Sequence, residues 1–166
     1  MSTTRFAPTS VGMNASAVVL KIDGLDLMFR QSDIPALESA SEVDGRDPRE
    51  ESVGWISYMR QRWPVYCLSD QLDLLGGVPP SRRTCALLAL ETGYIGVLCD
   101  DVDILKQAIG LRHEVPVAMK NADTPILELL LSGNKLLCAS NPTRLAAYIE
   151  HLIRKLSLPK ELPCLA

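Results

Sequence analysis

Short apolar runs separated by turn residues make up most of the chain before Asn141. The first run, 17–22, is followed by Asp23-Gly24 and by a second apolar run over 25–30. An Asp-Gly pair between two such runs is typical of a two-residue β-hairpin turn. Two further pairs of runs flank Glu91-Thr92-Gly93 and Ser132-Gly133-Asn134-Lys135. The pattern therefore predicts β-hairpins over 17–30, 85–99 and 126–139.

Another apolar stretch, from Gly54 to Leu68, carries both tryptophans and is interrupted by Arg60-Gln61-Arg62. We predict a fourth hairpin here, with its turn near Met59 to Gln61. Tryptophan, tyrosine and arginine are the residue types enriched at interface hot spots. Large aromatic side chains are more often buried, so a place in the core is the alternative for both tryptophans. The hypothesis for a partner-binding surface comprises Trp55, Tyr58, Met59, Arg60, Arg62 and Trp63.

The spacing of apolar residues changes after Asn141. Positions 145, 148, 149, 152 and 156 are apolar, which is the spacing of one face of an amphipathic helix. Asn141 is a favourable N-cap, and Pro142 suits the first helical position. A shorter helix is predicted over 69–75, capped by Ser69 and ended by Gly76-Gly77. The fold class expected is mainly β, with short helices and a C-terminal amphipathic helix.

The remaining segments suggest one domain with two tails. Residues 1–15 are rich in Ser, Thr, Pro and Ala, and we expect a flexible N-terminal tail there. The expected domain covers 16–157, and 158–166 form a C-terminal tail. Residues 44–52 are charged and contain Gly and Pro, which predicts an exposed loop. The run 105–110 is compatible with either a strand or a helix.

Composition narrows the function classes. The chain has 166 residues, of which 47% are hydrophobic, so it can bury a core without disulfides or metal. A net charge of -3 with 5% aromatic residues argues against nucleic-acid binding, which favours basic and aromatic surfaces. No apolar run approaches the roughly 18 residues of a membrane span, and the N-terminus lacks the apolar core of a secretory signal. We therefore expect a cytoplasmic protein without membrane insertion.

Candidate catalytic chemistry is sparse. Four of the five cysteines, Cys67, Cys85, Cys99 and Cys138, sit in apolar runs and are expected to be buried. The odd number excludes a complete disulfide framework. The histidines are His113 and His151, and a Cys67–His113 dyad has no support beyond the presence of both residue types. A thiol-dependent enzyme using Cys67 or Cys99 remains the alternative to a protein without catalytic activity.

Metal and phosphate sites are not predicted either. The histidines and cysteines lack zinc-site spacing, and no phosphate loop is present. Asp100, Asp101 and Asp103 form an acidic group. Successive strand residues point to opposite faces, so Asp100 and Asp101 would diverge if the strand continues through them. We expect no cofactor and no metal.

Two segments carry a resemblance to a known family. The first resembles the pattern Gly-Val-Ile-x-x-Arg-Gly-x-x-x-Pro-Val-x-Asp-Leu of CheW-like domains, with matches at Gly54, Ile56, Pro64, Val65 and Leu68. The second resembles the family pattern Gly-Leu-Val-Val-Asp-x-Val and is Gly96-Val97-Leu98-Cys99-Asp100-Asp101-Val102. The family's Arg-Gly pair falls on Met59-Arg60, and its Asp falls on Cys67. The resemblance is therefore to a divergent member, in which only Arg60 can replace the family's partner-contacting Arg.

The resemblance implies a fold of two small packed β-barrels. It also implies a non-catalytic, cofactor-free adaptor in bacterial chemotaxis signal transduction, working by protein–protein contact. Such an adaptor joins a CheA-like histidine kinase of a two-component system to methyl-accepting chemotaxis receptors, and is recruited to membrane-associated receptor arrays. A scaffolding or regulatory role in type IV pilus (twitching) motility signalling is the variant within the same class.

Overall fold

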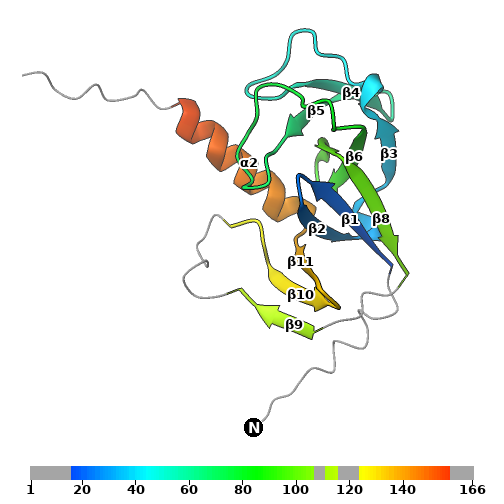
Figure 1. Cartoon of the computed structure of the whole chain (residues 1–166). Coiled ribbons are helices and arrows are strands. Elements are labelled where there is room, and N and C mark those ends of the chain that lie inside the picture. Colours follow the sequence, from blue (N-terminus) through cyan, green and yellow to red (C-terminus); the bar gives the residue numbers. More distant parts are fainter. Residues whose placement is uncertain (1–15, 107–110, 116–123, 158–166) are drawn as a thin grey trace, which may run out of the picture.

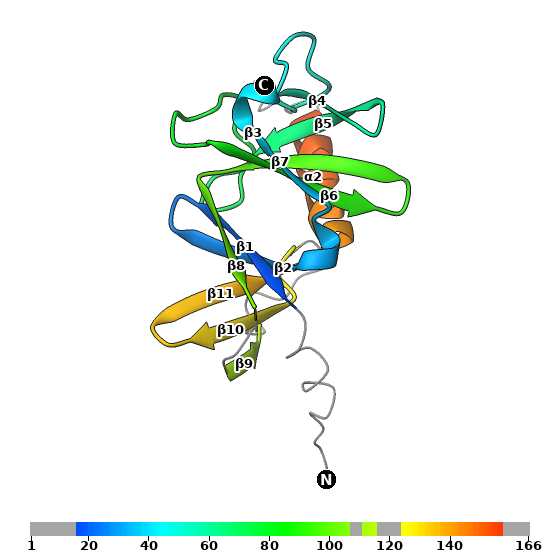
Figure 2. The same ribbon diagram turned by 90° about the vertical axis from the view of Figure 1, so that its right-hand side faces the viewer.

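The computed structural model describes residues 16–106, 111–115 and 124–157, with backbone alone for 111–113. These residues form two sheets and one long helix (Figures 1 and 2). The six-stranded sheet has the order β8-β1-β2-β11-β10-β9, and the five-stranded sheet has the order β3-β6-β7-β5-β4. The elements are β1 (Ala17–Ile22), β2 (Leu25–Arg30), η1 (Gln31–Asp33), β3 (Ala36–Ser39), η2 (Ala40–Glu42), β4 (Gly54–Tyr58), β5 (Gln61–Cys67), β6 (Thr84–Leu90), β7 (Gly93–Cys99), β8 (Asp101–Leu105), β9 (Leu111–Glu114), β10 (Glu128–Ser132), β11 (Lys135–Ala139) and α2 (Pro142–Ser157).

All four predicted hairpins are confirmed. They are the antiparallel pairs β1–β2, β4–β5, β6–β7 and β10–β11. In the first, Asp23 and Gly24 have φ of 49° and 93°, the left-handed conformation of a tight hairpin turn. Two parallel pairs join different hairpins: β2–β11 joins the first and last hairpins of the chain, and β5–β7 joins two consecutive ones. The chain passes from the five-stranded to the six-stranded sheet at Asp100, between β7 and β8.

Strand alternation divides the buried side chains into three clusters. Along β1, Val18, Leu20 and Ile22 point into the cluster between the two sheets, whereas Ala17 and Val19 point into a cluster within the six-stranded sheet. A third cluster lies within the five-stranded sheet. Strands buried on both faces have near-continuous apolar sequences, which explains why β1, β6 and β7 show little polar alternation. Each sheet therefore has a buried cluster of its own, and a further cluster lies where the two sheets pack against each other.

The C-terminal helix is confirmed. Asn141 Oδ1 accepts a hydrogen bond from the Arg144 N–H at 2.8 Å, as an N-cap does. Leu145 and Ile149 are buried in the cluster between the sheets, and the Tyr148 hydroxyl donates to the Leu72 carbonyl at 2.8 Å. The predicted apolar face ends earlier than expected, because Leu156 is 60% exposed.

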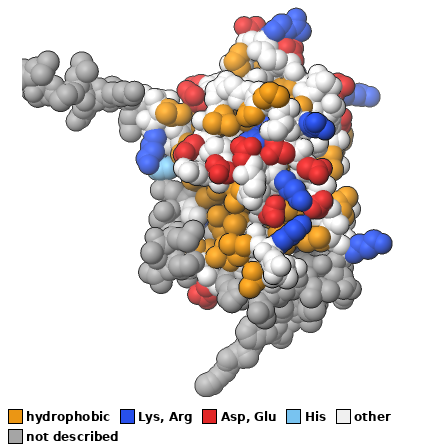
Figure 3. Space-filling model, in the orientation of Figure 1, with side chains coloured by type: hydrophobic (Ala, Val, Ile, Leu, Met, Phe, Trp, Pro, Cys, Tyr) orange, Lys and Arg blue, Asp and Glu red, His pale blue; other side chains and the backbone are white. Residues whose placement is uncertain are grey.

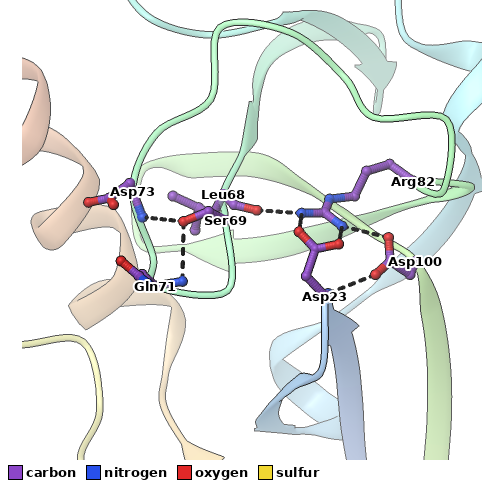
Figure 4. A network of polar contacts seen from close by, with 7 residues as sticks. All are labelled: Asp23, Leu68, Ser69, Gln71, Asp73, Arg82 and Asp100. Carbon is purple, nitrogen blue, oxygen red and sulfur yellow. Dashed lines mark hydrogen bonds and ion pairs between the residues drawn. The ribbon is translucent and has the colours of Figure 1, made fainter.

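The predicted helix over 69–75 is wrong. Leu68 and Leu74 form a β-bridge, and Leu72 has a φ of 63°, which no α-helix accommodates. The Ser69 hydroxyl accepts hydrogen bonds from the backbone N–H groups of Gln71 and Asp73, so it stabilises a turn in place of a helix (Figure 4). Among the described residues, the short helices are the 3-10 turns η1 and η2. The expected tails and the end of the ambiguous run, 107–110, lie outside the described residues.

Candidate functional site

The β4–β5 hairpin forms one edge of the five-stranded sheet and carries all six predicted partner-binding residues. Its turn consists of Met59 and Arg60, with φ of 52° and 65°. Hairpin turns with two left-handed residues favour Asn-Gly, because other side chains are strained there. Met59 is 67% exposed, and Arg60 is exposed beside it. The turn therefore projects an apolar and a cationic side chain into solvent from a strained backbone.

The six predicted residues do not share one face. The guanidinium carbon of Arg62 lies 4.9 Å from the ring centroid of Trp55, in a cation–π arrangement. Trp63 lies on the opposite face of β5, where its ring packs edge-on against Tyr94 with centroids 5.3 Å apart. Tyr58 packs on the same Tyr94 ring, with centroids 4.9 Å apart. The structure thus pairs Trp55 with Arg62 and groups Tyr58 with Trp63, while Met59 and Arg60 form the turn.

Neither tryptophan is a buried core residue. Both are partly exposed, and each indole N–H has a backbone partner: Trp55 Nε1 donates to the Asp47 carbonyl at 2.7 Å, and Trp63 Nε1 donates to the Tyr58 carbonyl at 2.9 Å. Full burial, the alternative from the sequence, is wrong for both: Trp55 lies on the edge strand β4, and Trp63 packs against the cluster of the five-stranded sheet but stays partly exposed. The Trp55 bond also holds the 44–52 loop against the hairpin; the loop is exposed as predicted over 45–51, whereas Ser52 is buried.

The loop is further ordered by Asp44. Its carboxylate accepts hydrogen bonds from the Arg46 guanidinium at 3.0 Å, which lower the pKa of Asp44 from 3.8 to about 2. A lowered carboxyl pKa means that the contact is fully present above pH 3.8 and is lost as the pH falls through about 2. The Asp44 and Trp55 backbones also exchange two hydrogen bonds of 2.8 Å, which cover part of the β4 edge.

A buried cation, Arg82, lies where the two sheets meet (Figure 4). Its side chain is fully buried and donates to both carboxylate oxygens of Asp23, at 3.0 and 2.9 Å. It also donates to the Asp100 carboxylate at 2.5 Å and to the Leu68 carbonyl at 2.7 Å. Asp100 in turn accepts from the Asp23 backbone N–H at 2.7 Å. One guanidinium thus joins the β1–β2 turn, the β7–β8 junction and the end of β5.

The charges of this network stabilise one another. Burial opposes ionisation of both Arg82 and Asp100, but their hydrogen bonds outweigh it, raising the pKa of Arg82 and lowering that of Asp100. The contribution of Asp100 to stability is therefore complete above its ordinary pKa of 3.8 and is lost as the pH falls through the lowered value. Arg82 stays charged across the whole physiological range.

Arg82 was not among the residues predicted to be functional. Asp100 and Asp101 do not converge, as expected. Asp100 pairs with Arg82, while Asp103 pairs with Lys21 at 3.0 Å and Asp101 accepts from the Val102 N–H. The three carboxylates have different partners and do not converge. Within the described residues, no group of three or more His, Cys, Asp or Glu side chains could hold a metal ion.

The four thiols in the described part of the chain lack the properties of nucleophiles. Cys67, Cys85, Cys99 and Cys138 are buried and free, as predicted. Burial raises the pKa of Cys85 and of Cys99 to about 12, and it also raises that of Cys67. Reactive thiols are exposed and have lowered pKa values. Cys67 lies in β5 and His113 in β9, which belong to different sheets, so the topology does not support a dyad.

A groove of about 520 Å³ lies beside the contact between α2 and the five-stranded sheet. Its sheet wall consists of β5 and the β6–β7 hairpin, including Trp63, Pro64, Tyr66 and Tyr94. Its helix wall and rim carry Ile149, Ile153, Glu150, Arg154, Arg49 and Glu50. The groove therefore combines aromatic and aliphatic side chains with two acidic and two basic residues, of which Glu150 and Arg154 form an ion pair at 3.8 Å.

Comparison with known proteins supports the fold. No family model and no curated protein matches the sequence. The crystal structure of the scaffolding protein TtCheW from Thermoanaerobacter tengcongensis is similar, with a TM-score of 0.58 and 16% sequence identity. The match covers 78% of this chain and 90% of TtCheW. It confirms the predicted fold class: a mainly β, CheW-like fold of two curled sheets and a C-terminal helix. No helix among the described residues is long and apolar enough to span a membrane.

Proposed function

We propose that this chain is a non-catalytic adaptor of a bacterial chemosensory system, which couples chemoreceptors to a CheA-type histidine kinase by protein–protein contacts. The observation that carries the proposal is the two-sheet fold shared with a scaffolding protein over 78% of the chain. The raised pKa values of the buried thiols favour this role over that of a thiol-dependent enzyme. The adaptor acts in the cytoplasm, at receptor arrays.

The β4–β5 hairpin is the proposed partner-binding surface. From Gly54 to Cys67 the hairpin contains two arginines and no carboxylate, so it complements an acidic partner. Met59 is the most exposed of the large apolar side chains described, and it shares the hairpin turn with Arg60. An exposed apolar side chain beside an arginine is a suitable anchor for a partner's pocket.

The proposal is tested by capture from native lysate, with bound proteins identified by mass spectrometry. The wild-type chain is expected to retain a histidine kinase of the CheA type or a chemoreceptor. Met59→Ala and Arg60→Ala are each expected to weaken capture about tenfold, because truncation of an interface anchor typically costs more than about 1 kcal/mol.

Lys135→Ala is the matched control, since Lys135 is an exposed cation at the turn of the β10–β11 hairpin in the other sheet. It is expected to leave capture unchanged. Absence of any kinase or receptor from the captured proteins would contradict the adaptor function. Equal capture by wild type and both hairpin variants would instead reject the hairpin as the binding surface.

A further inference from the structure

The outer edge of β4 is occupied at one point by the chain's own 44–52 loop. Asp44 forms an antiparallel β-bridge with Trp55, in which each backbone N–H donates to the other residue's carbonyl at 2.8 Å. This exchange is that of a hydrogen-bonded pair in an antiparallel sheet. Among the described strands, none lies beyond β4 in the five-stranded sheet. The loop therefore shows how an extended segment binds at this edge.

The edge of β4 continues past this bridge. Alternate residues of a strand point their backbone groups to the same side, so the N–H and C=O of Ser57 face outward as those of Trp55 do. Antiparallel pairing continued from Asp44 would place Glu42 opposite Ser57, but Glu42 lies in the 3-10 turn η2. Ser57 is exposed. The edge thus has room for a longer strand than the loop supplies, and such an edge is a template for strand addition.

Charges around this edge favour an acidic strand. Paired residues of an antiparallel ladder share a face, so Asp44, Trp55 and Arg62 lie on the same face, and the guanidinium of Arg62 stacks on the Trp55 ring. Hydrogen bonds from Arg46 lower the pKa of Asp44, and the charge of Arg62 adds to this effect. The loop has four carboxylates and two arginines, whereas the β4–β5 hairpin has two arginines and no carboxylate. The hairpin thus already attracts an acidic segment of the same chain.

The loop is suited to be displaced. Asp47 and Glu51 adopt left-handed φ values of 48° and 54°, and residues 45–51 are exposed. Exposed segments with strained backbone open locally at a lower free-energy cost than the whole fold. Opening would release the backbone groups of Trp55, and also its indole N–H, which donates to the Asp47 carbonyl.

We propose that the outer edge of β4 binds an extended, acidic segment of a partner protein by β-strand addition, in place of the 44–52 loop. The backbone of the segment pairs with Trp55 and Ser57, and its carboxylates face Arg62. In this mode main-chain hydrogen bonds supply affinity and the side chains supply specificity. The inference rests on the adaptor function proposed above, because it specifies the chemistry of the partner at the same hairpin.

The test uses the purified full-length chain and fluorescence anisotropy. The probe is a labelled peptide of alternating Val and Asp, which places all carboxylates on one face of a strand. Saturable binding is expected. The same peptide with methylated Asp backbone nitrogens keeps its charge but loses the donors to β4, so it should bind at least about tenfold more weakly. A peptide of alternating Val and Lys should not bind, because its charge repels that of the hairpin.

Two variants of the chain test the edge and the loop separately. Ser57→Pro removes one outward N–H, a change that an edge strand tolerates, and it should weaken binding of the Val-Asp peptide about tenfold. Ser57→Ala keeps that N–H and is the matched control, with unchanged affinity. Asp44→Pro removes the donor of the loop's bridge, and Val43 before it is already extended, as a residue before proline must be. It should raise the peptide affinity about threefold or more, because the competing loop is weakened.

Circular dichroism of each variant separates loss of binding from loss of fold. Equal affinity for the methylated and unmethylated peptides would overturn the proposal, as would equal binding by Ser57→Pro and Ser57→Ala or no gain with Asp44→Pro. Capture of a kinase or receptor by a chain that does not bind the peptide would reject this inference and leave the adaptor function standing. Peptide binding by a chain that captures neither protein would support strand addition and contradict the adaptor function.

Discussion

Replacing Arg82 by methionine is expected to lower the free energy of unfolding by about 3 kcal/mol, the lower end of the cost of removing one partner of a buried ion pair. The substitution keeps much of the apolar stem but removes the guanidinium donors to Asp23, Asp100 and the Leu68 carbonyl. The two carboxylates would then face one another without a cation. They are partly exposed, at 42% and 24%, which keeps the loss from being larger.

Urea or thermal unfolding followed by circular dichroism measures this loss. Arg83→Met is a matched control, since Arg83 is the exposed neighbour of Arg82, and its effect should stay within about 0.5 kcal/mol. Equal stability of the two methionine variants would show that the buried network around Arg82 does not stabilise the contact between the two sheets.

A second large effect is expected at Gly54, the first residue of β4. A Cβ at this position would lie 2.4 Å from the Asp44 carbonyl oxygen, which is backbone and accepts a hydrogen bond from the Trp55 N–H. Gly54→Ala must therefore displace the 44–52 loop from the hairpin. We expect a loss of about 2–3 kcal/mol in the free energy of unfolding, typical of overpacking, together with a change in Trp55 fluorescence.

Gly76→Ala provides the comparison. No atom lies within 4 Å of a Cβ at Gly76, and its φ is not positive. The free energy of unfolding of the Gly76→Ala protein should stay the same or rise by up to about 1 kcal/mol, because alanine lowers the entropy of the unfolded chain. A Gly54→Ala protein as stable as Gly76→Ala would show that the close approach of Asp44 to β4 does not occur in solution.

The local parts of the fold follow from the sequence, because turn residues and strand or helix periodicity act over short distances. Asp23-Gly24 specifies its hairpin through left-handed φ, and Asn141-Pro142 specifies the start of α2 through its cap. The segment 69–75 shows where such local rules fail. Ser69 caps backbone N–H groups there as it would in a helix, but Leu72 adopts a left-handed φ and the chain turns.

Features that depend on contacts between distant parts of the chain could not be predicted from these local rules. Nothing in the sequence distinguishes the buried Arg82 from the exposed Arg83, because burial depends on Asp23 and Asp100, 59 and 18 residues away. The same holds for the parallel pairing of β5 with β7, and for the groove, which needs α2 packed beside that sheet. All six residues of the partner-binding hypothesis lie on one hairpin, but the strand pairing divides them between two faces.

An adaptor must hold two partners at once, and this requirement gives the most direct test of the proposed function. The measurement is size-exclusion chromatography with light scattering on the purified chain, mixed with a CheA-type kinase and a chemoreceptor cytoplasmic fragment from the same organism. We predict one complex that contains all three proteins and that is lost with Arg60→Ala. Binding to neither protein, or mutual exclusion of kinase and receptor on the chain, would contradict the adaptor function.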